Sequence, residues 1–340
     1  MIRRPYAADI SIWPPFSKDF IGKGYLKGMS NTVAKQKKTV ITRKELAKQK
    51  VLIAWSAVFV IYGFIFCYLP LAGWLMAFEN YKNKTGLFHS QWVGLEKFKF
   101  LFSDATFIKV IRNTFCMGTL NLVFTTITAI VFAILLNEFR LLRAKKVVQT
   151  ISYLPHFLSW IIVTGILNDA LSSTGIINEL LIKFGLVKDT VPFFSIPALF
   201  WPIVTFAHVW KETGWNAIIY LSAITSIDPC LYEAASIDGA GRWGKIKNVT
   251  LPGIKPTIII LLIMNMGNLL NAGFEVQYLL GNGLVKSVSD TIDIYVLTWG
   301  ISQNDYSLGT AAGIFKSVVS IAIIVIANSI AKRTGEERLF

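Results

Sequence analysis

The sequence predicts an all-α polytopic membrane protein with six transmembrane helices and both termini in the cytoplasm. Of its 340 residues, 54% are hydrophobic and only 16% are charged, and the mean hydropathy is +0.53. A soluble chain of this composition would expose too much apolar surface. A bilayer core is crossed by about 20 apolar residues, and the chain offers six such segments. They cover residues 51–74, 111–136, 148–167, 196–224, 256–274 and 311–331.

Lys and Arg residues predict the orientation of these segments, because cytoplasmic loops carry an excess of them. Residues 1–50 hold twelve Lys and Arg against three acidic residues, and the link 138–149 holds four. With six crossings, the basic loop 226–255 and the basic C-terminal tail lie on the same side. The segment 277–310 carries one Lys against three Asp and lies on the other side. The charges of all these loops therefore agree with one topology, in which both termini lie in the cytoplasm.

Two parts follow from this pattern, a basic cytoplasmic extension over 1–50 and a transmembrane domain over 51–340. The extension lacks the apolar core and small-residue cleavage site of a signal peptide. Residues 42–50 are helical and basic, and we expect an amphipathic helix along the inner membrane surface. Two roles stay open for the extension: an anchor to anionic lipids and a contact with a soluble subunit.

The loop 226–255 contains the most informative stretch of the chain, EAASIDGAGRWGKIKNVTLP at 233–252. Asp228 followed by Pro229 is typical of a helix start, because the carboxylate accepts from free backbone amides and proline fits the first helical position. We expect a helix over 229–238 that ends at Gly239 and Gly241, which adopt positive φ easily.

Leu251-Pro252 is expected to mark the turn of this loop back into the membrane. Glu233 and the small Ala234 and Ala235 lie on the predicted helix. Small side chains permit close approach of a partner, and a carboxylate offers a charge-assisted contact. The loop therefore has the features of a docking element for a soluble protein.

The same residues resemble the EAA motif, EAA-x3-G-x9-I-x-L-P, of permease subunits in binding-protein-dependent ABC importers. Val249 stands where that pattern has Ile, which keeps a β-branched apolar side chain. Further stretches of the sequence are similar to permeases of the carbohydrate-uptake branch of these importers. Within that branch they are similar to permeases for oligosaccharides derived from alginate or pectin. These stretches are YLPLAGWLMAFENYK at 68–82, WVGLEKF at 92–98, LLNEFR at 135–140, QTISYLPHFLSW at 149–160 and GWNAIIYLSAITSIDPCLYEAA at 214–235.

This resemblance implies the type I ABC importer permease fold in a bacterial inner membrane. It implies a heterodimer with a second homologous permease, two cytoplasmic ATPase subunits and an extracytoplasmic solute-binding protein. ATP and Mg²⁺ would be bound by the ATPases, so this chain carries no cofactor and no catalytic residue. The loop would be the coupling helix that follows ATPase closure. Its coupling residues would be Glu233, Ala234, Ala235, Asp238, Gly239, Gly241, Leu251 and Pro252.

Substrate contacts are expected inside the bundle, where polar residues usually face a cavity or another helix. Aromatic rings stack on sugars, amides and carboxylates bond hydroxyls, and a cation suits an acidic sugar. The fourth segment carries polar residues beside Gly214 near its middle, which suggests a broken or widened helix. In the fifth, Asn268, Asn271 and Glu275 recur on one helical stripe. The candidates are Trp210, Lys211, Trp215, Asn268, Asn271 and Glu275.

Each candidate has a structural alternative. The two Asn residues can bond neighbouring helices, Lys211 and Glu212 can form an ion pair between subunits, and the Trp residues can belong to interfaces or cores.

Other functional classes fit less well. Residues 239–245 match G-x-G-x-x-G and most of a phosphate loop, but Ile246 replaces the Mg²⁺-binding Ser or Thr and no strand is expected before them. The placement of the positive charge fits topology better than nucleic-acid binding. The dispersed His and Cys residues form no pattern typical of a metal site or a catalytic nucleophile. An autonomous channel or secondary transporter is the alternative, and it would be expected to show inverted repeats and ion-coupling carboxylates.

Overall fold

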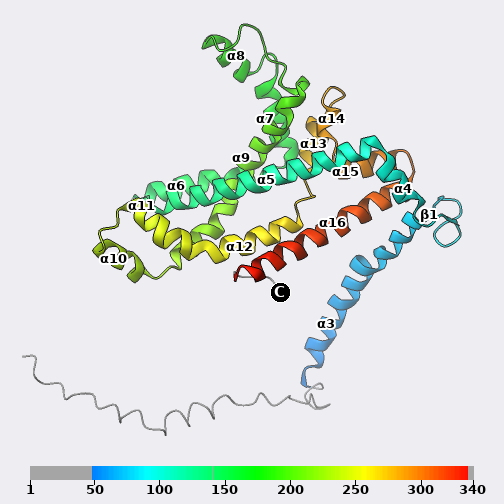
Figure 1. The fold of residues 1–340 in the computed structure, drawn as a ribbon, viewed down its shortest axis with the longest axis horizontal. Helices are drawn as coiled ribbons and strands as arrows, with labels where there is room; N and C mark the ends of the chain where they lie inside the picture. Colours follow the sequence, from blue (N-terminus) through cyan, green and yellow to red (C-terminus); the bar gives the residue numbers. More distant parts are fainter. Residues whose placement is uncertain (1–47, 140, 336–340) are drawn as a thin grey trace, which may run out of the picture. The chain divides into compact units, whose positions relative to one another are not determined.

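The computed structural model describes residues 48–139 and 141–335, and these are almost entirely helical (Figure 1). The chain divides into two units, 1–69 and 70–340, each described by itself. The first unit contains α3 (Lys50–Gly63) and the π-helical η1 (Phe64–Tyr68), and none of their residues is buried. Most of the extension 1–50, with its expected amphipathic helix, lies outside the described residues.

The second unit begins at Pro70, within the 3-10 helix η2 (Leu69–Phe78), which leads into a small hairpin. In it, β1 (Glu79–Asn80) pairs antiparallel with β2 (Gln91–Trp92), and Glu79 stands opposite Trp92. The helix α4 (Glu96–Ser103) follows. Ser307 Oγ donates to the Glu79 carbonyl at 2.6 Å and so ties the hairpin to the C-terminal helix. We call this the hairpin end of the bundle.

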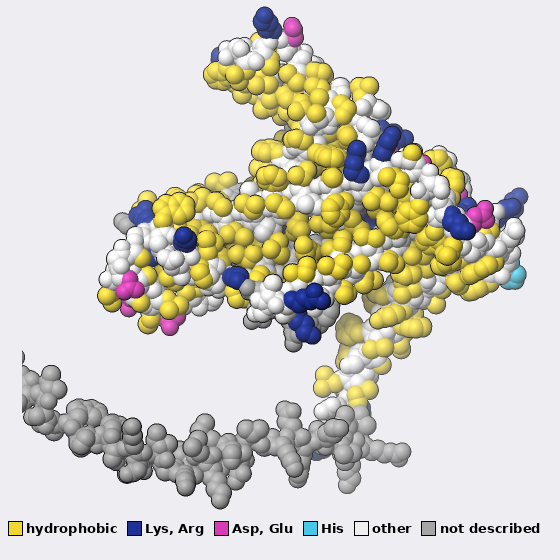
Figure 2. All heavy atoms as spheres, in the orientation of Figure 1, with side chains coloured by type: hydrophobic (Ala, Val, Ile, Leu, Met, Phe, Trp, Pro, Cys, Tyr) yellow, Lys and Arg dark blue, Asp and Glu magenta, His cyan; other side chains and the backbone are white. Residues whose placement is uncertain are grey.

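The core of the second unit is the packing of α5 (Ala105–Asn137) on α9 (Pro197–Thr225). Asp104 starts α5 by accepting from the Thr106 amide at 2.8 Å. Small residues let the two helices approach, and Ala129, Ala133 and Ala217 are fully buried where they meet. Most outward side chains on the face seen in Figure 2 are hydrophobic, as expected for helices that meet lipid.

The third predicted span, 148–167, is wrong as a single helix. The structure has α6 (Leu142–Tyr153), the 3-10 turn η3 (Leu154–Phe157) and α7 (Trp160–Leu171) instead. Pro155 has no N–H and its ring clashes with the carbonyl four residues earlier, so it ends α6. Leu158 and Ser159 are extended, and the Ser159 hydroxyl accepts from the Ile162 amide to begin α7.

At the opposite end of the bundle, which we call the loop end, α10 (Pro229–Ile237) confirms the expected loop helix (Figure 1). Asp228 Oδ1 accepts from the Cys230 amide at 2.9 Å, and Gly239 follows with φ +77°. Gly241 differs from the expectation, because its φ of −69° and ψ of −177° are extended, and it begins α11 (Arg242–Lys245).

The helical run continues from α11 through the π-helical η5 (Ile246–Thr250) into α12 (Leu251–Gly267). Leu251-Pro252 therefore marks no turn, and the chain reverses at 239–241. Pro252 has no N–H to donate, and it lies directly after the π-helical η5, where the regular i→i−4 ladder is already interrupted. The fifth predicted span, 256–274, runs past the end of α12. Asn268, Asn271 and Glu275 do not share a helical stripe, because 268–273 form a turn that ends at Gly273 with φ +91°.

The remaining elements build the hairpin end and the C-terminal helix. A short apolar helix, α15 continued by the π-helical η6, packs against α16, and their glycines Gly300 and Gly309 meet there. Lys316 Nζ of α16 bonds Asp293 Oδ1 of α15 at 2.6 Å. The bounds are α8 Ile176–Lys183, η4 Phe193–Ser195, α13 Phe274–Leu280, α14 Lys286–Ser289, α15 Ile292–Tyr295, η6 Val296–Ser302 and α16 Tyr306–Arg333.

Five helical runs among the described residues are long and apolar enough to cross a membrane. The 29-residue α9 covers the fourth predicted span but is not among them, since polar residues such as Lys211 and Glu212 lower its hydropathy. The chain is therefore a multi-pass helical membrane protein. That it crosses the membrane six times stays a prediction. The five runs are Lys50–Phe78, Ala105–Asn137, Trp160–Lys183, Arg242–Gly267 and Tyr306–Arg333.

The glycine contact between η6 and α16 predicts a position that tolerates no added carbon. A Cβ at Gly309 would lie 2.7 Å from the Gly300 Cα, whereas nothing lies within 4 Å of a Cβ at Gly313, one turn further on. We expect Gly309→Ala to lower the free energy of unfolding by about 1–3 kcal/mol through overpacking. Gly313→Ala is the control and should leave stability equal or slightly higher. Thermal denaturation in detergent measures both, and equal melting temperatures would contradict the contact.

Candidate functional site

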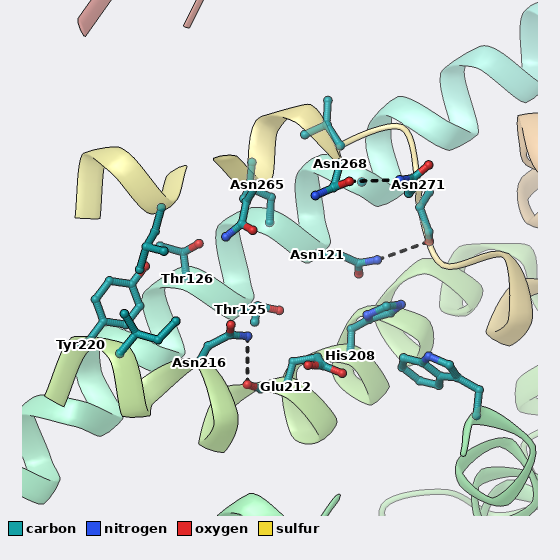
Figure 3. A pocket seen from close by; sticks show the side chains of 17 residues that line it. Asn121, Thr125, Thr126, His208, Glu212, Asn216, Tyr220, Asn265, Asn268 and Asn271 are labelled. Carbon is teal, nitrogen blue, oxygen red and sulfur yellow. Dashed lines mark hydrogen bonds between the residues drawn. The ribbon is translucent and has the colours of Figure 1, made fainter. Parts of the chain in front are cut away.

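A cavity of about 420 Å³ lies between α5, α9, α12 and the turn after α12 (Figure 3). Its lining is rich in amides and hydroxyls. In the part of the chain that the structure describes, one carboxylate and no Lys or Arg lines it. Such groups bond hydroxyl-rich ligands. The polar lining residues are Asn121, Thr125, Thr126, His208, Glu212, Asn216, Tyr220, Asn265, Asn268 and Asn271.

The helical repeat explains why these side chains converge. On α9, His208, Glu212, Asn216 and Tyr220 follow one another at intervals of four, and residues so spaced share a helix face. On α5, Asn121 and Thr125 have the same spacing. Sequence analysis did not select these residues. The signal that could have found them is the four-residue polar repeat within otherwise apolar helices.

The wall opposite α9 is formed where α12 stops. Figure 3 shows Asn265 on α12, and Asn268 and Asn271 on the turn that follows. Asn271 Nδ2 donates to Asn268 Oδ1 at 3.2 Å. Asn121 Nδ2 reaches the Ala272 carbonyl at 3.5 Å and so connects this turn to α5.

Two buried polar atoms at this cavity have no protein partner among the described residues, Asn121 Oδ1 and His208 Nε2. Gly273 lies directly against His208, since a Cβ on it would come 2.5 Å from Nε2. Buried polar groups of this kind are normally satisfied by water or a ligand.

A network beside the cavity holds the break between α6 and α7 against α9. His156 Nδ1 and Glu212 Oε2 are 2.9 Å apart, and the His156 ring stacks on Trp215 with centroids 4.5 Å apart. Lys211 Nζ donates to the His156 carbonyl at 2.5 Å and lies 3.7 Å from Glu212 Oε1. Non-helical backbone at membrane depth needs such partners. The network therefore supports the break, and Glu212 joins it to the cavity wall.

The sequence-predicted path residues fall into two groups. Asn268 and Asn271 line the cavity, whereas Trp210, Lys211, Trp215 and Glu275 do not. Lys211 is 5% exposed, and its ammonium lies over the Trp160 ring at 5.4 Å. Trp210 lines a separate apolar pocket beside α7, and Glu275 is exposed in the first turn of α13.

The expected break in the fourth segment is wrong, because α9 is a continuous α-helix from Pro197 to Thr225. Gly214 has a different role. A Cβ there would collide with the Ser152 carbonyl, so the glycine allows the last turn of α6 to lie against α9.

The predicted coupling residues gather at the loop end. Glu233 and Ala234 are exposed on α10, Asp238 caps its C-terminus, and Gly239 makes the turn. Two large apolar residues that sequence analysis missed lie beside them, Ile237 at 87% and Trp243 at 82% exposure. Apolar side chains this exposed in a polar loop are typical of an interaction surface.

Comparison with known proteins agrees with this arrangement. Residues 126–336 match the family described as binding-protein-dependent transport system inner membrane component. Protein LplB of Bacillus subtilis (strain 168) is 43% identical over 292 residues, which are 83% of this chain and 88% of that protein. The polygalacturonan/rhamnogalacturonan transport system permease protein YteP of the same organism is 41% identical over 296 residues, 87% of this chain and 92% of that protein.

A solved structure has the same fold. The chain superposes on a bacterial alginate ABC transporter, crystallised with an alginate pentasaccharide-bound periplasmic protein, with a TM-score of 0.81 at 38% identity. The match covers 88% of this chain and 100% of that one. A match of this extent, together with the family match over 126–336, settles the assignment. The chain belongs to the family of inner-membrane components of binding-protein-dependent transport systems, and it is a permease of the ABC importer type.

Proposed function

We propose that this chain is the transmembrane permease subunit of an ATP-driven importer that translocates an acidic oligosaccharide delivered by a solute-binding protein. The observation that carries the proposal is the amide-lined cavity between α5, α9 and α12, because its groups suit sugar hydroxyls. The names of the relatives supply the substrate class: alginate for the solved transporter and polygalacturonan or rhamnogalacturonan for YteP.

The chain would cross a bacterial inner membrane six times with both termini in the cytoplasm. The five apolar runs and α9 support this number of crossings, since each is long enough to span a bilayer core. The excess of Lys and Arg in 1–50, 138–149 and the 226–255 loop supports a cytoplasmic loop end. The hairpin end would then face the solute-binding protein.

A second, homologous permease would complete the translocation path, and two ATPase subunits would dock at the loop end and hydrolyse ATP. The exposed surface of α10 and α11 supports docking there, since it combines the Glu233 carboxylate with the apolar side chains of Ile237 and Trp243. In the first unit, α3 has no buried residue, so its apolar faces are available to lipid and to the second permease. ATP and Mg²⁺ would be held by the ATPases.

Within the cavity, the sugar would be held through its hydroxyls. Asn216 and Asn265 come from facing helices, and His208 Nε2 and Asn121 Oδ1 have free hydrogen-bonding capacity. Lys211 is bonded to the His156 carbonyl and Glu212 instead. We therefore assign Lys211 a structural role, and the carboxylates of an acidic sugar would meet other parts of the assembled importer.

The first test of the proposed function is whether the chain forms a complex with a second permease and ATPase subunits. The tagged chain, purified from detergent-solubilised native membranes, should bring down a second permease and an ATPase at about two copies per copy of this chain. The eluate should hydrolyse ATP faster when sugar-loaded binding protein is added. Purification alone or as a homodimer, without ATPase in several detergents, would instead favour an autonomous channel or secondary transporter.

The turn after α10 predicts a coupling defect with a matched control. Gly239 and Gly185 both have positive φ, +77° and +68°, with nothing within 4 Å of an added Cβ. Leucine costs about 1–2 kcal/mol in that conformation, so Gly239→Leu and Gly185→Leu should destabilise their turns equally. Only Gly239→Leu should abolish ATP hydrolysis stimulated by sugar-loaded binding protein, because only its turn belongs to the ATPase docking loop. Equal stimulation in both variants would remove this turn from the coupling mechanism.

Lys211 provides a test of where the acidic group is recognised. Lys211→Met removes the donor to the buried His156 carbonyl, and we expect the free energy of unfolding to fall by about 1–3 kcal/mol. Uptake of uronate and neutral oligosaccharides of equal length should fall together, as measured with radiolabelled sugars in proteoliposomes. A selective loss of uronate uptake at unchanged stability would make Lys211 a substrate ligand.

A further inference from the structure

A pair of hydroxyl groups connects the docking helix α10 to the helical run that leads into the bundle. The Tyr232 hydroxyl lies 3.0 Å from Thr250 Oγ1. Thr250 is 3% exposed although it lies in a polar loop region. Thr250 Oγ1 also donates to the Lys245 carbonyl at 3.5 Å, so its own proton is used and the Tyr232 hydroxyl is left to donate to it.

Thr250 is the last residue of the π-helical η5, at the junction with α12. A π-helical turn leaves the usual i→i−4 ladder locally, and such turns occur often at functional sites. The tyrosine contact therefore reaches the helical run where its ladder changes from the π-helical to the α-helical pattern.

A second contact reinforces the same junction. Gly253, in the first turn of α12, lies against the side chain of Ile227, and a Cβ on the glycine would come 2.6 Å from Ile227 Cδ1. Ile227 directly precedes Asp228, the cap of α10. The base of α12 is thus held to the α10 segment from two sides.

The helix α12 connects this junction to the cavity. It is assigned as one α-helix from Leu251 to Gly267, with Pro256 inside it, and its 17 residues span about 25 Å. Its last turns carry Asn265 into the cavity wall, and Asn268 follows directly after its end (Figure 3). Because α12 is continuous through Pro256, a displacement of its base is carried along the helix to these amides.

We propose that the Tyr232–Thr250 hydroxyl pair positions α12 on the docking helix, so that displacement of α10 moves Asn265 and Asn268 in the cavity. Tyr232 and Thr250 are thus positioning residues for coupling. The inference rests on the proposed function. Glu233, Ile237 and Trp243 would bind the ATPase, whereas this pair would carry the movement to α12.

The test uses the complete importer in proteoliposomes with sugar-loaded binding protein, and it measures ATP hydrolysed per oligosaccharide imported. Tyr232→Phe removes one oxygen and keeps the ring. Thr250→Val removes the partner hydroxyl, and Thr250→Ser restores it. Thr150→Val is the matched control, because the exposed Thr150 hydroxyl bonds only the Lys146 carbonyl within its own helix.

We expect Tyr232→Phe and Thr250→Val to raise the ATP consumed per sugar by roughly two- to tenfold, the factor that one hydrogen bond contributes to an equilibrium. Complex assembly and basal hydrolysis should stay intact. Thr250→Ser and Thr150→Val should couple like the unaltered importer. The double variant should be no worse than either single variant, because both remove the same contact.

Three results would overturn the inference: an unchanged ratio in both single variants, additive defects in the double variant, or loss of assembled complex without a change in the ratio. If the unaltered complex itself imports no sugar on ATP hydrolysis, the proposed function fails and this inference with it. If the unaltered complex and both single variants import sugar with the same coupling, the proposed function is supported. Only the role of the Tyr232–Thr250 hydroxyl pair is then contradicted.

Discussion

Hydrocarbon offers no hydrogen-bond partner, and this constraint governs the structure wherever the backbone leaves the helix at membrane depth. The break between α6 and α7 exposes the His156 carbonyl, and Lys211 of α9 satisfies it. Glu212 then holds both the His156 ring and the Lys211 ammonium. Because Glu212 also lines the cavity, one of the groups that make the break tolerable is part of the cavity wall.

The cavity depends on a second interruption, the end of α12 at Gly267. A helix continued to residue 274 would place Asn268 and Asn271 about 60° apart around its axis, and both would point to one side of the helix. The turn instead lets Asn271 bond Asn268 and brings the Ala272 carbonyl to Asn121 on α5. Irregular backbone thus supplies polar groups from directions that a straight helix does not reach.

The sequence was sufficient for the features that depend on local chemistry. Composition predicted the helical membrane fold, and the Asp228-Pro229 cap and Gly239 predicted α10 almost to the residue. The failures have a common cause. Apolar character alone does not distinguish a straight span from one broken at Pro155, and helical periodicity was applied to 268–275 beyond the point where α12 ends. The site was found only in part because its polar residues come from α5, α9 and α12, whose packing on one another is a property of the tertiary fold.

The hairpin of α15, η6 and α16 has a consequence for how the chain is made. Ile292–Ser302 is apolar but has too few residues to cross a bilayer, so a translocation machinery that selects segments by length and hydropathy has no full span to insert there. The segment's contacts with α16, between Gly300 and Gly309 and between Asp293 and Lys316, can form only after α16 has been synthesised. The hairpin end therefore gains these contacts from a helix that follows it in the chain, after the segment itself has been synthesised.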